Sequence, residues 1–125
     1  MKTISTAKAP AAVGPSSQAI ETGDFLFLSG QIPLVPETGL LVSEKIGDQT
    51  EQVMKNMRAV CEAAGGSLSK IVKCTVFMTD LSQFQTMNEI YARHFGDHKP
   101  ARSTVQVAAL PRGSAVEIEA IMYLK

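Results

Sequence analysis

The chain has 125 residues, of which 45% are apolar and 19% are charged, a composition typical of a soluble, packed domain and unlike that of a disordered or fibrous chain. We therefore expect a single domain spanning residues 1–125. Twelve basic residues balance twelve acidic ones, and they form no basic run, which argues against a nucleic-acid-binding surface.

The cysteines and the N-terminus indicate an intracellular protein. Cys61 and Cys74 form neither a CxxC motif nor a cysteine–histidine pair, so we expect two buried thiols in a reducing compartment, without a disulfide or a zinc site. Residues 1–6 are not followed by the apolar core of a signal peptide. No stretch approaches the ~18 apolar residues of a membrane span, so we expect a cytoplasmic location.

The first forty residues predict a β-hairpin and an irregular loop. Segments 19–22 and 25–29 flank Gly23-Asp24, a pair suited to the positive φ angles of a two-residue hairpin turn. Prolines and glycines between residues 30 and 39 indicate a loop, and a short strand is expected at 40–42.

A helix and a central strand follow. Apolar residues recur with a period of 3.6 between 46 and 64, with Asp48 and Glu51 at the spacing of a capping box. Over 71–78 the period changes to two, which predicts a strand. One face of this strand is expected to be wholly apolar and to consist of Val72, Cys74, Val76 and Met78.

The remaining elements complete an α+β pattern. Asp80 and Gln83 introduce a second helix that Gly96 ends, and strands are expected near 103–107 and 116–124. Two helices can cover only one face of such a mixed β-sheet. On the last strand, the face away from the buried residues would carry Glu117, Glu119, Ile121 and Tyr123. This mixture favours an assembly interface that contains a polar site, and a solvated face with two stray hydrophobic residues is the alternative.

Known catalytic motifs give little guidance. GxSxG, P-loop, HExxH and GxGxxG patterns are absent, so nucleoside phosphates, dinucleotides and zinc have no support in the sequence. His94 and His98 are four residues apart, but a helix end separates them, and we interpret them as terminal polar residues and not as a metal pair. Arg102 leads directly into a strand, where its planar guanidinium would suit a small acid. An intersubunit salt bridge is the alternative role for Arg102.

Four segments match one family in order. They are GPSSQA at 14–19, SGQIP at 29–33, PARS at 100–103 and VEIEA at 116–120, joined by KCTVF at 73–77. Over essentially its whole length the chain resembles the RidA (YjgF) reactive-intermediate deaminase family. The resemblance implies a chorismate-mutase-like fold and a homotrimer whose sheets form a central β-barrel. It also implies active sites in the clefts between subunits.

The same resemblance implies an imine or enamine hydrolase that needs neither cofactor nor metal. Family members convert 2-iminopropanoate and 2-iminobutanoate, released by pyridoxal-phosphate enzymes, into 2-oxo acids and ammonia. Arg102 would bind the substrate carboxylate, and Glu117, in preference to Glu119, would hold or deprotonate the attacking water. The further positions expected to bind substrate or support the cleft are Ser16, Ser29, Gln31, Asn88 and Thr104.

Two positions depart from the family pattern. Ser16 stands where the family has a tyrosine that lines the cleft, so the pocket is expected to be wider or to bind more weakly. Thr104 stands where a cysteine is frequent. Ser16 leaves open a non-catalytic, small-acid-binding or regulatory member of the family. Ribonuclease activity and translation inhibition, also linked to the family, have little support from the neutral charge.

Overall fold

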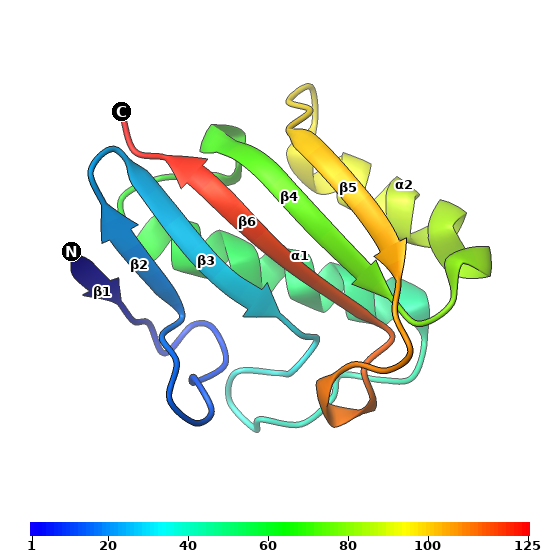
Figure 1. The fold of residues 1–125 in the computed structure, drawn as a ribbon. Coiled ribbons are helices and arrows are strands. Elements are labelled where there is room, and N and C mark those ends of the chain that lie inside the picture. Colours follow the sequence, from blue (N-terminus) through cyan, green and yellow to red (C-terminus); the bar gives the residue numbers. More distant parts are fainter.

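In the computed structural model, which describes all 125 residues, two helices cover one face of a six-stranded sheet (Figure 1). The strands are β1 (Lys2–Ile4), β2 (Ala19–Thr22), β3 (Phe25–Gln31), β4 (Ile71–Met78), β5 (Ala101–Gln106) and β6 (Val116–Tyr123). The helices are α1 (Ile46–Ala63) and α2 (Phe84–Phe95). The strand order is β1-β2-β3-β6-β4-β5, with β4 and β5 parallel and all other neighbours antiparallel. The predicted α+β architecture, with both helices on one face of a mixed sheet, is confirmed.

The core lies between the sheet and the two helices, where one cluster contains 22 buried residues. The predicted apolar stripe of α1 supplies Met54, Met57 and Cys61, and α2 supplies Met87. Cys74 of β4 belongs to the same cluster, so both cysteines are buried free thiols, as predicted. Neither helix is both long and apolar enough to cross a membrane.

The predicted capping box of α1 is wrong. The helix begins at Ile46, so Asp48 lies inside its first turn, and Lys45 occupies the cap position without a side-chain hydrogen bond. The Asp48 carboxylate instead accepts a hydrogen bond of 2.9 Å from the Ser43 hydroxyl. Asp80 does act as a cap, because its Oδ1 accepts a hydrogen bond of 2.9 Å from the Ser82 backbone N–H. This contact starts the short 3-10 turn that runs into α2.

Three strand predictions need correction. A bulge between Ile71 and Lys73 of β4 leaves Val72 exposed and Ile71 buried, so the apolar face of this interior strand does not include Val72. Residues 40–42 form no strand, since Leu41 makes only an isolated bridge with Leu34. β1 is absent from the prediction and is held by three pairs with β2.

The register of the sheet decides which side chains can meet. Arg102 pairs with Cys74 across β5 and β4, so it shares the helix-covered face with that buried residue. Glu117 pairs with Phe77 across β6 and β4, and both lie on the opposite face, which no helix covers. Arg102 and Glu117 are therefore on opposite faces of the sheet.

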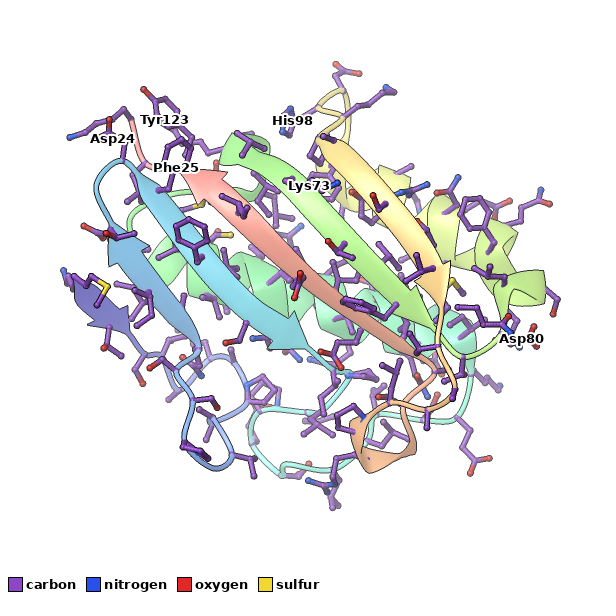
Figure 2. All side chains as sticks on the ribbon, in the orientation of Figure 1. Asp24, Phe25, Lys73, Asp80, His98 and Tyr123 are labelled. Atoms are coloured by element: carbon purple, nitrogen blue, oxygen red, sulfur yellow. The ribbon has the colours of Figure 1, made fainter.

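The open face of the sheet is rich in exposed apolar side chains. Phe25, Phe27 and Tyr123 are 40%, 45% and 41% exposed, and the Phe25 and Tyr123 ring centroids lie 5.6 Å apart. Figure 2 shows Phe25 and Tyr123 together near the hairpin turn, on the side of the sheet away from the helices. The open face thus exposes more large apolar side chains than the two that the solvated-face alternative assumed, which favours the interpretation as an interface.

Candidate functional site

Arg102, the second residue of β5, lines a cleft of about 380 Å³ between α2 and the start of the strand. Its Nη1 donates a hydrogen bond of 2.6 Å to the Asn88 Oδ1 of α2. Its Cζ lies 4.8 Å from the centroid of the Tyr91 ring and 5.5 Å from that of Phe84. Both aromatic residues fall within the second helix predicted from the sequence, where they have the spacing of core residues. The signal for their second role is spacing, because 84, 88 and 91 share one face of a helix.

The Arg102 guanidinium has no counter-charge in its own chain. The ion pairs of the structure join His94 to Glu51 and Lys125 to Asp24, and neither includes Arg102. A partly buried cation without a carboxylate partner is poised to bind one from outside. An ion pair within the chain is thereby excluded for Arg102, and an anion supplied by a ligand or by another chain remains its natural partner.

A second cleft, of about 290 Å³, contains Ser16, Ser29, Gln31 and Glu117. The Ser29 hydroxyl donates a hydrogen bond of 2.6 Å to the Ser17 carbonyl, which ties β3 to the segment that carries Ser16. The Ser16 hydroxyl donates to the Val13 carbonyl at 3.3 Å, so it is engaged within its own loop. Gln31 is buried at the end of β3.

The Glu117 carboxyl lies beside an irregularity in β3. Leu28 pairs with Ala120 and Gln31 pairs with Ile118, so two residues of β3, Ser29 and Gly30, face one residue of β6. The Glu117 carboxyl packs against Gly30, and a Cβ at that position would overlap it. The prediction that this glycine lies in the loop after the hairpin is wrong, because β3 continues to Gln31.

The environment of Glu117 changes its acidity. Burial raises the pKa of the Glu117 carboxyl above its ordinary value, and the charge of the neighbouring Glu119 adds to the effect. A carboxylate with a raised pKa is a stronger base than an ordinary one. The acidity of this group thus fits a general acid or base.

The predicted site residues fall into two groups within one chain. Arg102 and Asn88 meet in the first cleft, whereas Ser16, Ser29, Gln31 and Glu117 gather in the second. Thr104 follows Arg102 on the helix-covered face, where its hydroxyl is buried without a hydrogen-bond partner, and it lines neither cleft.

The two histidines have separate partners. His94 Nε2 lies 2.9 Å from the Glu51 carboxylate and its Nδ1 lies 3.0 Å from Arg58. His98 Nε2 lies 2.6 Å from the Ile71 carbonyl. No three histidine, cysteine or acidic side chains come together in a way that could hold a metal ion.

The structure is thus a small α+β protein in which an arginine without an internal counter-charge lines a cleft beside α2. The sequence model of the Endoribonuclease L-PSP family matches residues 6–124. The chain belongs to this family, which includes proteins named reactive intermediate deaminases. The resemblance to the RidA (YjgF) family is thereby confirmed.

Relatives match the chain along nearly its full length. The Arabidopsis thaliana protein named Reactive Intermediate Deaminase A, chloroplastic, is 54% identical over 121 residues, which cover 97% of this chain and 65% of that protein. The human 2-iminobutanoate/2-iminopropanoate deaminase is 47% identical over 120 residues, 96% of this chain and 88% of that protein. Among solved structures, E. coli TdcF with bound serine is 44% identical, with a TM-score of 0.94 over 98% of both chains.

Proposed function

We propose that the chain hydrolyses 2-iminopropanoate and 2-iminobutanoate to the corresponding 2-oxo acids and ammonia. The Arabidopsis thaliana and human relatives described above are named as deaminases, and the chain is an enzyme of that class. The observation that carries the proposal is the Arg102 guanidinium, which lies in a cleft beside Asn88 and has no internal counter-charge. The carboxylate of a small imino acid supplies the missing negative charge.

The complete site is formed between two copies of the chain in this proposal. Arg102 and Glu117 lie on opposite faces of one sheet, so a single copy cannot direct both at one small molecule. The cleft that contains Arg102 in one copy then faces the cleft that contains Ser29, Gln31 and Glu117 in its neighbour. Ser16 forms part of the same neighbouring wall.

The rest of the sheet supports a closed assembly of three copies. β5 is an edge strand, so one row of its backbone hydrogen-bonding groups is unpaired within the chain. The open face presents Phe27 and Tyr123, which are costly to leave in water. A homotrimer whose sheets close into a central β-barrel buries this face, while the helices remain outside.

Little catalytic machinery is required, because a protonated imine is already electrophilic at C2. Arg102 binds the substrate carboxylate and Glu117 takes a proton from water as the water oxygen bonds to C2. The C=N π electrons pass to nitrogen, which gives a carbinolamine. Glu117 then returns the proton to nitrogen and the C–N bond breaks. The leaving ammonia takes the hydroxyl proton, so the products are a 2-oxo acid and ammonium.

Backbone groups near two further residues contribute to the addition of water. As water adds to C2, the charge distribution of the substrate changes. Polar groups that are already in position stabilise the new distribution without having to move. In the proposal this role falls to backbone groups near Ser29 in the second cleft, together with backbone groups near Thr104 of the edge strand β5. Thr104 lines neither cleft of a single chain, so it joins the site only where two copies meet. The bond between the Ser29 hydroxyl and the Ser17 carbonyl holds that part of the wall in place.

Ser16 favours one rival function, in which the chain binds small acids without turning them over. Serine has no ring to line the cleft, and the Ser16 hydroxyl already donates a hydrogen bond to the Val13 carbonyl. In that case pyruvate would bind in calorimetry, Arg102→Ala would abolish the binding, and imine hydrolysis would stay at the spontaneous rate.

The activity is tested by following ammonia release from 2-iminopropanoate generated in the assay. The wild type is expected to exceed the spontaneous rate, and Arg102→Ala to remove the gain, because the substrate loses its anchor. Arg93→Ala is the matched control, since Arg93 lies on α2 but lines neither cleft. Equal rates for the wild type and Arg102→Ala would exclude the proposed role of Arg102.

Mixing two inactive variants tests whether the site is shared. Arg102→Ala and Glu117→Gln are each expected to be inactive alone. In mixed assemblies, some sites take Arg102 from one variant and Glu117 from the other. Random mixing in equal amounts restores about a quarter of the sites. No recovery after co-refolding would show that each site lies within one chain, and light scattering of a stable monomer would exclude the trimer.

A further inference from the structure

We infer that Tyr91 is a positioning residue for Arg102. The ring faces of Tyr91 and Phe84 together hold the Arg102 guanidinium in place. The inference rests on the proposed function in one respect, because it takes Arg102 to be the carboxylate anchor. It concerns how the anchor is oriented before any substrate arrives. The relevant observation is that three residues of one helix surround one guanidinium, from positions 84, 88 and 91.

The hydrogen bond from Arg102 to Asn88 is not sufficient to orient the anchor. It fixes Nη1 at 2.6 Å from one oxygen, but the flat guanidinium can still rotate about that contact. Two-point binding of a carboxylate depends on the plane of the guanidinium, because two parallel N–H groups must point at two oxygens. A second kind of contact is needed to define that plane.

The two aromatic rings supply this contact. The Arg102 Cζ lies 4.8 Å from the Tyr91 centroid and 5.5 Å from the Phe84 centroid, both within the range of cation–π attraction. Tyr91 is only 7% exposed and Phe84 packs against the core cluster, so both rings are themselves held in place. Contact with ring faces restricts the tilt of the guanidinium and leaves its remaining N–H groups free for a ligand.

The ring of Tyr91, and not its hydroxyl, performs this role. The hydroxyl is buried and makes no hydrogen bond of normal geometry, although the Cys74 thiol and the Arg102 guanidinium are its polar neighbours. Burial raises the pKa of Tyr91 far above its ordinary value, and the neighbouring Cys74 thiol adds to the shift. The hydroxyl is therefore neutral, and it is not suited to proton transfer. This makes phenylalanine the informative conservative substitution.

Three variants separate positioning from helix stability. Tyr91→Leu removes the ring face, whereas Tyr91→Phe retains it. Ile90→Ala removes a buried apolar side chain of the same helix that packs toward Gly47 of α1, away from Arg102. The probe is pyruvate, a product of the proposed reaction, titrated by calorimetry. Tyr91→Leu is expected to weaken its binding about five- to tenfold, and Tyr91→Phe to restore most of the affinity.

The kinetic constants give a second readout. In the hydrolysis assay, Tyr91→Leu is expected to raise KM and lower kcat together, because a loosely held carboxylate also misplaces C2. Ile90→Ala is expected to lower the melting temperature but to leave the Kd of pyruvate near that of the wild type. Equal weakening in Ile90→Ala and Tyr91→Leu would overturn the inference, since general loss of helix packing would then explain both.

NMR relaxation of the arginine Nε–H groups in the free protein keeps this test independent of the proposed function. The chain has only four arginines, Arg58, Arg93, Arg102 and Arg112, so the signals can be assigned by single substitutions. Arg102 is expected to be rigid in the wild type and Tyr91→Phe and mobile in Tyr91→Leu. If Arg102 is equally mobile in the wild type and Tyr91→Leu, the inference fails even where hydrolysis is observed. If it is rigid but no imine is hydrolysed, only the proposed function fails.

Discussion

Replacing Gly30 with alanine tests the placement of Glu117 without removing any functional group. The φ angle of Gly30 is not in the left-handed region, so the backbone accepts alanine. The new Cβ would overlap the Glu117 carboxyl, and this side chain must rotate away because the strand cannot. The substitution therefore moves the proposed base while keeping its chemistry intact.

The expected cost to stability is small. Forcing the Glu117 side chain off its preferred rotamer costs about 0.5–1.5 kcal/mol, and replacing a strand glycine by alanine stabilises by about 0.5–1 kcal/mol. These effects nearly cancel, so the melting temperature is expected to change by less than about 5 °C. Misplacement of a general base that contributes about 10²- to 10⁴-fold is expected to lower kcat/KM at least tenfold.

Gly66 provides a matched control. A Cβ at Gly66 would also overlap the end of a side chain, that of Met122, but Met122 is fully buried in the core. Gly66→Ala is expected to cost about 1–3 kcal/mol of stability through overpacking and to leave kcat/KM unchanged in the folded enzyme. The assay is ammonia release, with thermal unfolding measured in parallel. The reasoning would be refuted if Gly30→Ala kept wild-type kcat/KM, or if Gly66→Ala lost as much activity.

Three more outcomes are expected. Burial raises the pKa of the Glu117 carboxyl in the folded chain, so its ionisation opposes folding at high pH. In an Arg102→Ala background, where no neighbouring guanidinium lowers this pKa, adding Glu117→Gln should increase stability at about pH 8, with the difference closing toward about pH 4 in urea unfolding. Asn88→Ala removes the bond to Arg102 and should weaken pyruvate binding about three- to tenfold in calorimetry. In pH–rate profiles, the acid limb of kcat should lie at a higher pH than that of kcat/KM, because bound substrate is expected to neutralise Arg102 and so raise the pKa of Glu117.

The elements that the sequence predicts correctly are those with a local physical signal. The 3.6-residue period of α1, the start and end signals of α2, and the Gly23-Asp24 pair between β2 and β3 can be recognised because each depends on neighbouring residues. β1 has three residues and exists only through pairing with β2, a distant contact that leaves no periodicity. Val72 is misplaced because a bulge shifts the alternation of β4 by one residue.

The candidate site shows the same limit. Family motifs identify Arg102 and Glu117 as individual positions, but they do not reveal that the register of β4 places the two side chains on opposite faces. Tyr91 has the spacing of a core residue and is one, so its contact with Arg102 becomes visible only when α2 lies beside β5. The division of the site into two clefts is a property of the packed sheet and not of any segment.

This division has a consequence for acid–base chemistry. If Arg102 and Glu117 met within one chain, the guanidinium would pair with the carboxylate, lower its pKa and fill the carboxylate-binding site. Held on opposite faces, both groups remain unpaired in the chain, and Glu117 keeps its raised pKa. In the proposed assembly they approach each other, and a free Arg102 of the neighbouring copy would lower the pKa of Glu117. A bound substrate carboxylate neutralises Arg102 and so raises that pKa again, which makes Glu117 a stronger base when substrate is present.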